Sequence, residues 1–144
     1  MSEGHHLDAN VILRFLLADD RSHSPKAKAL FEQAHAGKLS LAISHVTLAE
    51  VTWVLLSYYE FERTKLARTL RELVLHEGVE VDDSDVILDA FDRFAKVNVD
   101  FIDCYMAALA KDRDAVVVTE DRDFRKFPDV VARRPEEIVK QFVK

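Results

Sequence analysis

Short apolar runs alternate with longer amphipathic stretches along this chain. A short run rich in β-branched residues predicts a strand, whereas apolar residues three and four positions apart predict a helix. The pattern predicts five short strands: one ending at Leu7, then residues 39–43, 79–81, 115–118 and 130–132. Helices are predicted between them; Ser24 and Pro25 begin one that Gly37 ends, and Gly78 ends another.

Strands separated by helices of this length pair in parallel through right-handed crossovers. The predicted fold is therefore α/β, a three-layer helix/sheet/helix sandwich around a parallel sheet of four to five strands. The sequence has no repeat and no Gly/Ser-rich linker, so residues 1–144 are expected to form a single domain. Ligands of such sheets bind beyond the carboxyl ends of the strands.

Composition places the chain among ordinary compact proteins, since 49% of its 144 residues are hydrophobic and 32% are charged. A chain of this length folds without metal or disulfide support, and its single cysteine, Cys104, cannot form an internal disulfide. No stretch approaches the roughly 20 apolar residues of a membrane span, so no membrane partner is expected. The opening MSEGHH, which is compatible with residues added for expression, lacks the apolar segment of a signal peptide. The cytoplasm is the expected location.

The formal net charge of -6, from 26 acidic and 20 basic residues, is opposite to that of a simple electrostatic nucleic-acid binder. It is compatible with a nuclease, because acidic residues gathered at a metal site account for part of a negative charge.

Two acidic residues in the first half of the chain stand next to apolar segments. Asp8 directly follows Leu7, with Asn10 two residues on, and an N-cap explains Asp8 equally well. Glu50 interrupts an almost wholly apolar helix, on which Trp53 is expected to pack in the core. Because burying an unpaired charge is costly, Glu50 needs either a partner or solvent, and a water-facing helix edge is the simpler alternative.

The second half contains two further acidic segments. Asp100 and Asp103 precede an apolar helix; we assign Asp100 to the N-cap, and Asp103 projects toward the strand ends. The strand at 115–118 is followed at once by Thr119, Asp121 and Asp123, which a solvated turn would also explain. Four basic residues near the acidic segments are candidates for contacts to phosphate: Arg14, Arg122, Arg125 and Lys126. Arg14 is the strongest candidate of the four.

The acidic segments meet if strand ends and helix starts lie along one edge of a parallel sheet. That edge would gather Asp8, Glu50, Asp103 and Asp121. Like charges that close repel one another, so a cation between them makes physical sense. Oxygen-only ligands favour Mg²⁺ or Mn²⁺ over zinc, and such ions activate water for attack on a phosphodiester. Thr119 and Asn10 would hold the carboxylates or the attacking water.

The segments LDANVILR, DFIDCYMAA and VVVTEDRDF, together with the isolated Glu50, resemble the PIN-domain ribonucleases, and most of all the VapC-type toxins. The resemblance runs from Leu7 to the closing RRPEEIVKQF. It implies that Asp8, Glu50, Asp103 and Asp121 are catalytic and bind Mg²⁺ or Mn²⁺, with Asp123 a further ligand and Thr119 a supporting group. It also implies cleavage of RNA, a homodimer and a cognate antitoxin that silences the enzyme.

Other functions stay open at this point. One is a PIN-like RNA-processing nuclease that is not a toxin. Another is a receiver-like domain in which an aspartate beside Mg²⁺ accepts a phosphoryl group, but such a domain needs an early acidic pair where this chain has Asp8 alone. A non-catalytic module that binds RNA or an antitoxin ranks lowest, because all four carboxylates are present.

Overall fold

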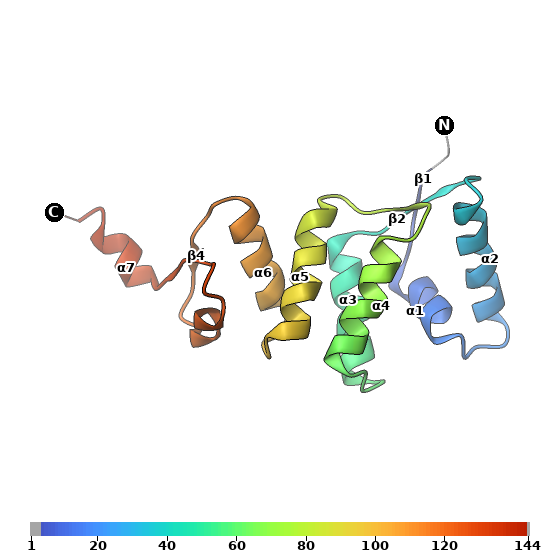
Figure 1. Ribbon diagram of the computed structural model, residues 1–144, viewed down its shortest axis with the longest axis horizontal. Helices are drawn as coiled ribbons and strands as arrows, with labels where there is room; N and C mark the ends of the chain where they lie inside the picture. The colour runs from blue at the N-terminus through green and yellow to red at the C-terminus, as the bar shows by residue number, and fades with distance from the viewer. Residues whose placement is uncertain (1–3, 144) are drawn as a thin grey trace. The chain divides into compact units, whose positions relative to one another are not determined.

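A computed structural model describes residues 4–143 of the chain (Figure 1). The chain divides into two compact units, Met1–Ser84 and Asp85–Lys144, each with a sheet and a set of buried side chains of its own. Within residues 4–143 there are seven α-helices and five strands, and every strand pair is parallel. No helix in this part of the chain is long and apolar enough to cross a membrane.

The N-terminal unit builds a three-stranded sheet from two crossovers, each of which contains two helices. The elements in chain order are β1 (Gly4–His6), α1 (Ala9–Leu17), α2 (His23–His35), β2 (Ser40–Ala42), α3 (His45–Ser57), α4 (Arg63–Val74) and β3 (Val79–Glu80). The strands lie in the order β1-β2-β3, with Gly4 opposite Ser40 and Leu41 opposite Val79. Helix α1 packs against α2 and α3, and α3 packs against α4.

Buried apolar side chains from each layer stabilise this unit. Ile12, Phe31, Leu41 and Leu48 are almost completely buried, and the rings of Phe15 and Phe31 stack with centroids 3.9 Å apart. Burial of side chains of this size contributes roughly 1.5–3 kcal/mol each. These contacts fix α1, and with it the Asp8 position at its start, against the rest of the unit.

Gly78 allows the chain to enter β3 close to α2. Its φ is +86°, and a Cβ atom at this position would collide with the backbone carbonyl of Ala34. The Gly78 carbonyl accepts a hydrogen bond from the Leu41 amide at 2.8 Å, which begins the pairing of β2 with β3. Only glycine satisfies both the left-handed backbone and the close approach.

The C-terminal unit places two long helices before a two-stranded parallel pair. Val117 lies opposite Ala132, and Phe91, Phe94 and Cys104 are completely buried. The Phe91 and Phe101 rings stack 4.8 Å apart, which joins the first two helices of the unit. The elements are α5 (Ser84–Lys96), α6 (Phe101–Asp112), β4 (Val117–Val118), the 3₁₀ helix η1 (Arg122–Lys126), β5 (Ala132–Arg133) and α7 (Pro135–Lys140).

Arg93 ties α5 to the segment that follows η1. Its guanidinium donates to both carboxylate oxygens of Asp129, at 2.9 and 2.6 Å, and through Nε to Asp89 at 3.0 Å. It also lies 5.5 Å from the ring centroid of Phe127. The pKa of Asp129 is lowered, chiefly by the hydrogen bonds from Arg93. Arg93 therefore holds the chain at Asp129, which follows Asp121 and Asp123 in the sequence.

The predicted α/β class with parallel pairing is confirmed, and the strands lie close to the predicted positions. They are shorter than predicted, and in residues 4–143 they form two sheets rather than one. Strands β4 and β5 contain two residues each, and their ladder consists of hydrogen bonds such as the one from the Thr119 amide to the Arg133 carbonyl at 2.9 Å. The single domain expected over residues 1–144 stays a prediction.

Candidate active site

Asp103 is positioned by the first turn of α6. Asp100 is the N-cap residue, as predicted, with φ -60° and ψ 148°, and its carbonyl accepts a hydrogen bond from the Cys104 amide at 3.1 Å. The Asp100 side chain makes no capping hydrogen bond to the helix. Asp103 follows three residues later and is half-buried, so its carboxylate has lost part of its contact with water.

Asp121 and Asp123 are positioned by the short connection from β4 into η1. The Thr119 hydroxyl oxygen accepts a hydrogen bond from the Asp121 amide at 2.9 Å. The Asp121 carboxylate in turn accepts one from the Asp123 amide at 2.9 Å and so caps η1. The Thr119 hydroxyl therefore orients the backbone at Asp121, and its supporting role in a reaction stays a prediction.

These elements bring three carboxylates together. Asp103, Asp121 and Asp123 each offer a carboxylate oxygen, and the three oxygens lie within 4.8 Å of one another. The pKa of Asp103 is raised, first by burial and then by the negative charges of Asp121, Asp100 and Asp123. A set of oxygen donors that repel one another fits a hard divalent cation such as Mg²⁺ or Mn²⁺. We refer to these three residues as the carboxylate cluster.

The Lys126 side chain reaches the carboxylate cluster. The Lys126 ammonium lies 3.9 Å from an oxygen of Asp123 and 3.4 Å from the Asn98 carbonyl, to which it donates. A single exposed ammonium offsets only part of the charge of three carboxylates. The cluster therefore keeps a negative charge that a cation can neutralise.

The other predicted site residues belong to the N-terminal unit. Asp8 is the N-cap residue of α1, where its exposed side chain makes no capping hydrogen bond. Glu50 is exposed on α3, which agrees with the simpler of its two interpretations. Asn10 and Arg14 line one pocket of about 520 Å³ over α1 and α2, and Arg14 pairs with Asp20 at 3.3 Å.

The family model described as "PIN domain" matches residues 6–130. The chain belongs to the PIN-domain family. The match includes every predicted site residue, from Asp8 to Asp123, and extends over both compact units. PIN domains are nucleases, and carboxylates that fit a divalent cation are the chemistry such an enzyme needs.

A solved structure similar to this PIN-domain chain is described as VapBC2 from Rickettsia felis bound to a DNA fragment from their promoter. It is 14% identical, with a TM-score of 0.37, and the alignment covers 92% of this chain and 98% of that one. No curated protein matches the chain.

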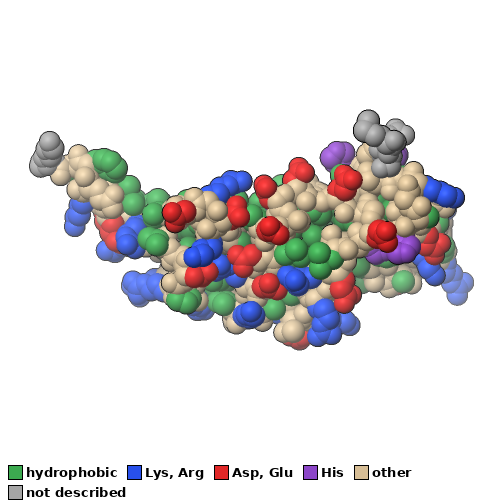
Figure 2. Space-filling view, turned by 45° about the horizontal axis from the view of Figure 1, so that its top comes forward, with side chains coloured by type: hydrophobic (Ala, Val, Ile, Leu, Met, Phe, Trp, Pro, Cys, Tyr) green, Lys and Arg blue, Asp and Glu red, His purple; other side chains and the backbone are tan. Residues whose placement is uncertain are grey.

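A pocket lies beside the carboxylate cluster and shares Asp121 with it. Its volume is about 410 Å³, and Thr119 and Asp121 line it together with four arginines: Arg122, Arg125, Arg133 and Arg134. We refer to it as the arginine pocket. Figure 2 shows basic and acidic side chains interspersed over the face in view. The sequence predicts phosphate contacts for Arg122 and Arg125, but it did not lead us to predict a site role for Arg133 and Arg134. The signal for them was the Arg-Arg pair directly after the last predicted strand.

Proposed function

We propose that this PIN-domain chain is an Mg²⁺- or Mn²⁺-dependent endoribonuclease that hydrolyses RNA phosphodiester bonds. The observation that carries the proposal is the carboxylate cluster, in which three oxygens from two separate segments lie within 4.8 Å of one another. Membership of a nuclease family supports the reaction class, and the resemblance to VapC-type toxins supports RNA as the substrate.

Asp103, Asp121 and Asp123 would hold the metal ion. When bound, such an ion lowers the pKa of a coordinated water and offsets the charge that builds up on the leaving oxygen. Thr119 holds the Asp121 backbone in place, and the Asp121 carboxylate holds Asp123 through its amide. On the strength of the resemblance, we assign Asp8 and Glu50 to the same reaction, Asn10 to a supporting polar role and Arg14 to substrate binding.

We further propose that the chain is the toxin of a type II toxin-antitoxin pair. On this proposal its partners are an RNA substrate, a cognate antitoxin and a second copy of the chain, and it acts in the cytoplasm. The alternative is a PIN-like RNA-processing nuclease that is not a toxin. Induced expression distinguishes the two: a toxin arrests growth, and Asp121→Asn abolishes the arrest, whereas cells tolerate a processing nuclease.

The nuclease proposal is tested with purified protein, free of antitoxin, and a pool of cellular RNA. Parallel reactions contain Mg²⁺, Mn²⁺ or EDTA, and each is repeated with Asp8→Asn, Glu50→Gln, Asp103→Asn and Asp121→Asn. We expect discrete fragments with metal that disappear with EDTA and in every variant. Full activity of Asp121→Asn would overturn the assignment of the carboxylate cluster.

A further inference from the structure

We propose that the arginine pocket binds a backbone phosphate of single-stranded RNA next to the phosphodiester that is cleaved. Its anchors are Arg122, Arg125 and Arg133. This inference rests on the proposed ribonuclease function and adds a strand-binding site to it. The pocket lies wholly in the C-terminal unit and shares Asp121 with the carboxylate cluster, so an occupant would lie at the site of cleavage.

Two elements direct the anchors into the pocket. Arg122 and Arg125 are three residues apart in η1, and side chains at that spacing lie above one another in a 3₁₀ helix. Arg133 ends β5, where it lies opposite Val118, and its carbonyl accepts the hydrogen bond from the Thr119 amide. The same backbone contact therefore positions Arg133 and the segment that leads to Asp121.

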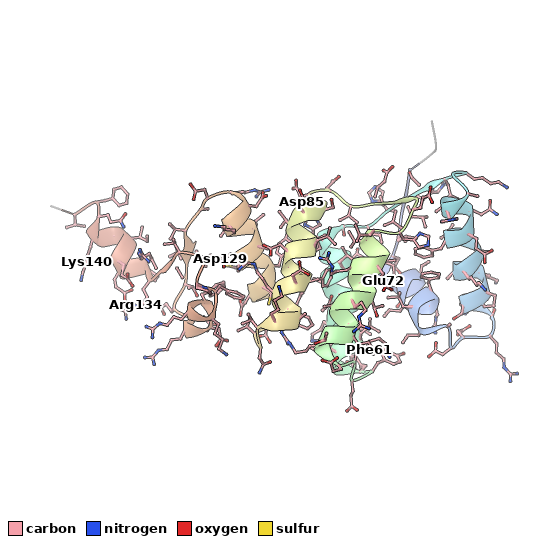
Figure 3. The ribbon with its side chains drawn as sticks, viewed as in Figure 1. Phe61, Glu72, Asp85, Asp129, Arg134 and Lys140 are labelled. Atoms are coloured by element: carbon pink, nitrogen blue, oxygen red, sulfur yellow. The ribbon has the colours of Figure 1, made fainter. Side chains whose placement is uncertain are left out.

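The ion pairs in the pocket decide which arginines can bind an anion. Arg134, at the start of α7 (Figure 3), has its Nε atom 3.1 Å from Glu136 and 3.4 Å from Glu137. Arg122 and Arg125 form no ion pair with any residue of the described range 4–143. The Arg133 guanidinium donates to the Ala132 carbonyl at 3.0 Å and is exposed. Three guanidinium groups are therefore accessible to an anion.

The remaining charges of the pocket favour a phosphate close to a metal ion. Beyond the two glutamates that Arg134 engages, its acidic residues are Glu120 and Asp121. Asp121 belongs to the carboxylate cluster, whose charge a divalent cation would offset. Guanidinium groups bind phosphate oxygens in pairs of parallel hydrogen bonds, and contacts of this kind position a nucleic-acid strand without reading its sequence.

The test measures binding of a fluorescent single-stranded oligoribonucleotide by anisotropy, with Ca²⁺ in place of Mg²⁺, so that a cation offsets the charge of the carboxylate cluster while the strand stays intact. We expect the triple change Arg122→Gln, Arg125→Gln, Arg133→Gln to weaken binding by about fivefold for each arginine removed. The slope of log affinity against log salt should fall in magnitude by about 0.7, because the contact to one phosphate is lost. The double change Arg21→Gln, Lys140→Gln removes exposed charges outside the pocket and should have a much smaller effect.

Glu136→Gln should change the affinity for RNA in the opposite direction. It removes one of the two carboxylates that engage Arg134, so RNA should bind more tightly than to the unmodified chain. In cleavage reactions the triple change should raise KM and leave kcat nearly unchanged, because a phosphate outside the reacting bond is bound equally in the ground and transition states.

Three results would overturn the inference: no binding of the oligoribonucleotide by the unmodified chain, equal affinity of the triple variant, or equally good competition by an acidic peptide. Failure of the proposed function is a different result, in which no RNA is cleaved with any metal although the binding differences are present.

Discussion

Replacement of Asp103 by Asn tests whether the carboxylate cluster is built for a cation. The change keeps the shape of the side chain and removes one of three mutually repelling charges. In the absence of metal we therefore expect the variant to be more stable than the unmodified chain. The direction agrees with the raised pKa of Asp103, which shows that the folded protein disfavours the charged form of this side chain.

The distances in the cluster set the magnitude of this effect. Oxygens of the three carboxylates lie within 4.8 Å of one another, and unit charges at that separation repel by about 0.9 kcal/mol in bulk water. Asp103 has two such neighbours and is only half-buried, so we expect a gain of about 2 kcal/mol in the free energy of unfolding. For a chain of this size the midpoint of thermal unfolding should rise by about 4–8 °C.

Thermal unfolding followed by circular dichroism measures the effect, first with EDTA and then with increasing Mn²⁺. The unmodified chain should gain stability with Mn²⁺, by about 2.7 kcal/mol when the metal reaches 100 times its dissociation constant. Asp103→Asn should gain far less. Asp19→Asn, which removes an exposed charge from the N-terminal unit, is the matched control and should respond like the unmodified chain. An Asp103→Asn variant that melts no higher with EDTA and still responds fully to Mn²⁺ would show that the carboxylate cluster is not a cation site.

Two further changes test the packing of each unit, and both are measured by chemical denaturation. Arg93→Met leaves Asp129 and Asp89 without their partner and should cost about 1–3 kcal/mol, because the carboxylates are partly exposed. The pKa of Asp129 is lowered from 3.8 in the folded state, so its pair with Arg93 stabilises the protein above pH 3.8 and loses that effect as the pH falls through the lowered pKa. Arg93→Met should remove this acid dependence, and an unchanged pH profile would contradict the assignment. Gly78→Ala should cost at least about 2 kcal/mol, because the added Cβ collides with the Ala34 carbonyl at a positive φ; a stability equal to that of the unmodified chain would contradict this.

The sequence predicted the parts of the fold that depend on local patterns. Strand positions and the helix start at Asp100 follow from apolar runs and capping preferences. The strand at Gly4–His6, predicted as a short strand that ends at Leu7, is the one with the weakest side-chain pattern, since all three of its residues are exposed and its pairing with β2 depends on backbone hydrogen bonds.

Other features depend on contacts that no local pattern contains. Helix α3 is apolar on nearly every side, so its sequence does not indicate which face is covered; Trp53, expected in the core, is 57% exposed. The cluster of Asp103, Asp121 and Asp123 could be anticipated because each follows a strand end or begins a helix. Arg133 and Arg134 follow the last predicted strand as an Arg-Arg pair, but no local pattern shows that they lie beside Asp121, because that depends on the pairing of β4 with β5.

The proposed hydrolysis of RNA would depend on a divalent cation held by Asp103, Asp121 and Asp123. The most direct measurement is mass spectrometry of the fragment ends after cleavage in isotopically heavy water with Mn²⁺. Hydrolysis should leave one heavy oxygen in the terminal phosphate of each cut, and no cut should form in EDTA or with Asp121→Asn. Fragments that end in a cyclic phosphate, formed by the ribose hydroxyl in the presence of EDTA, would contradict it.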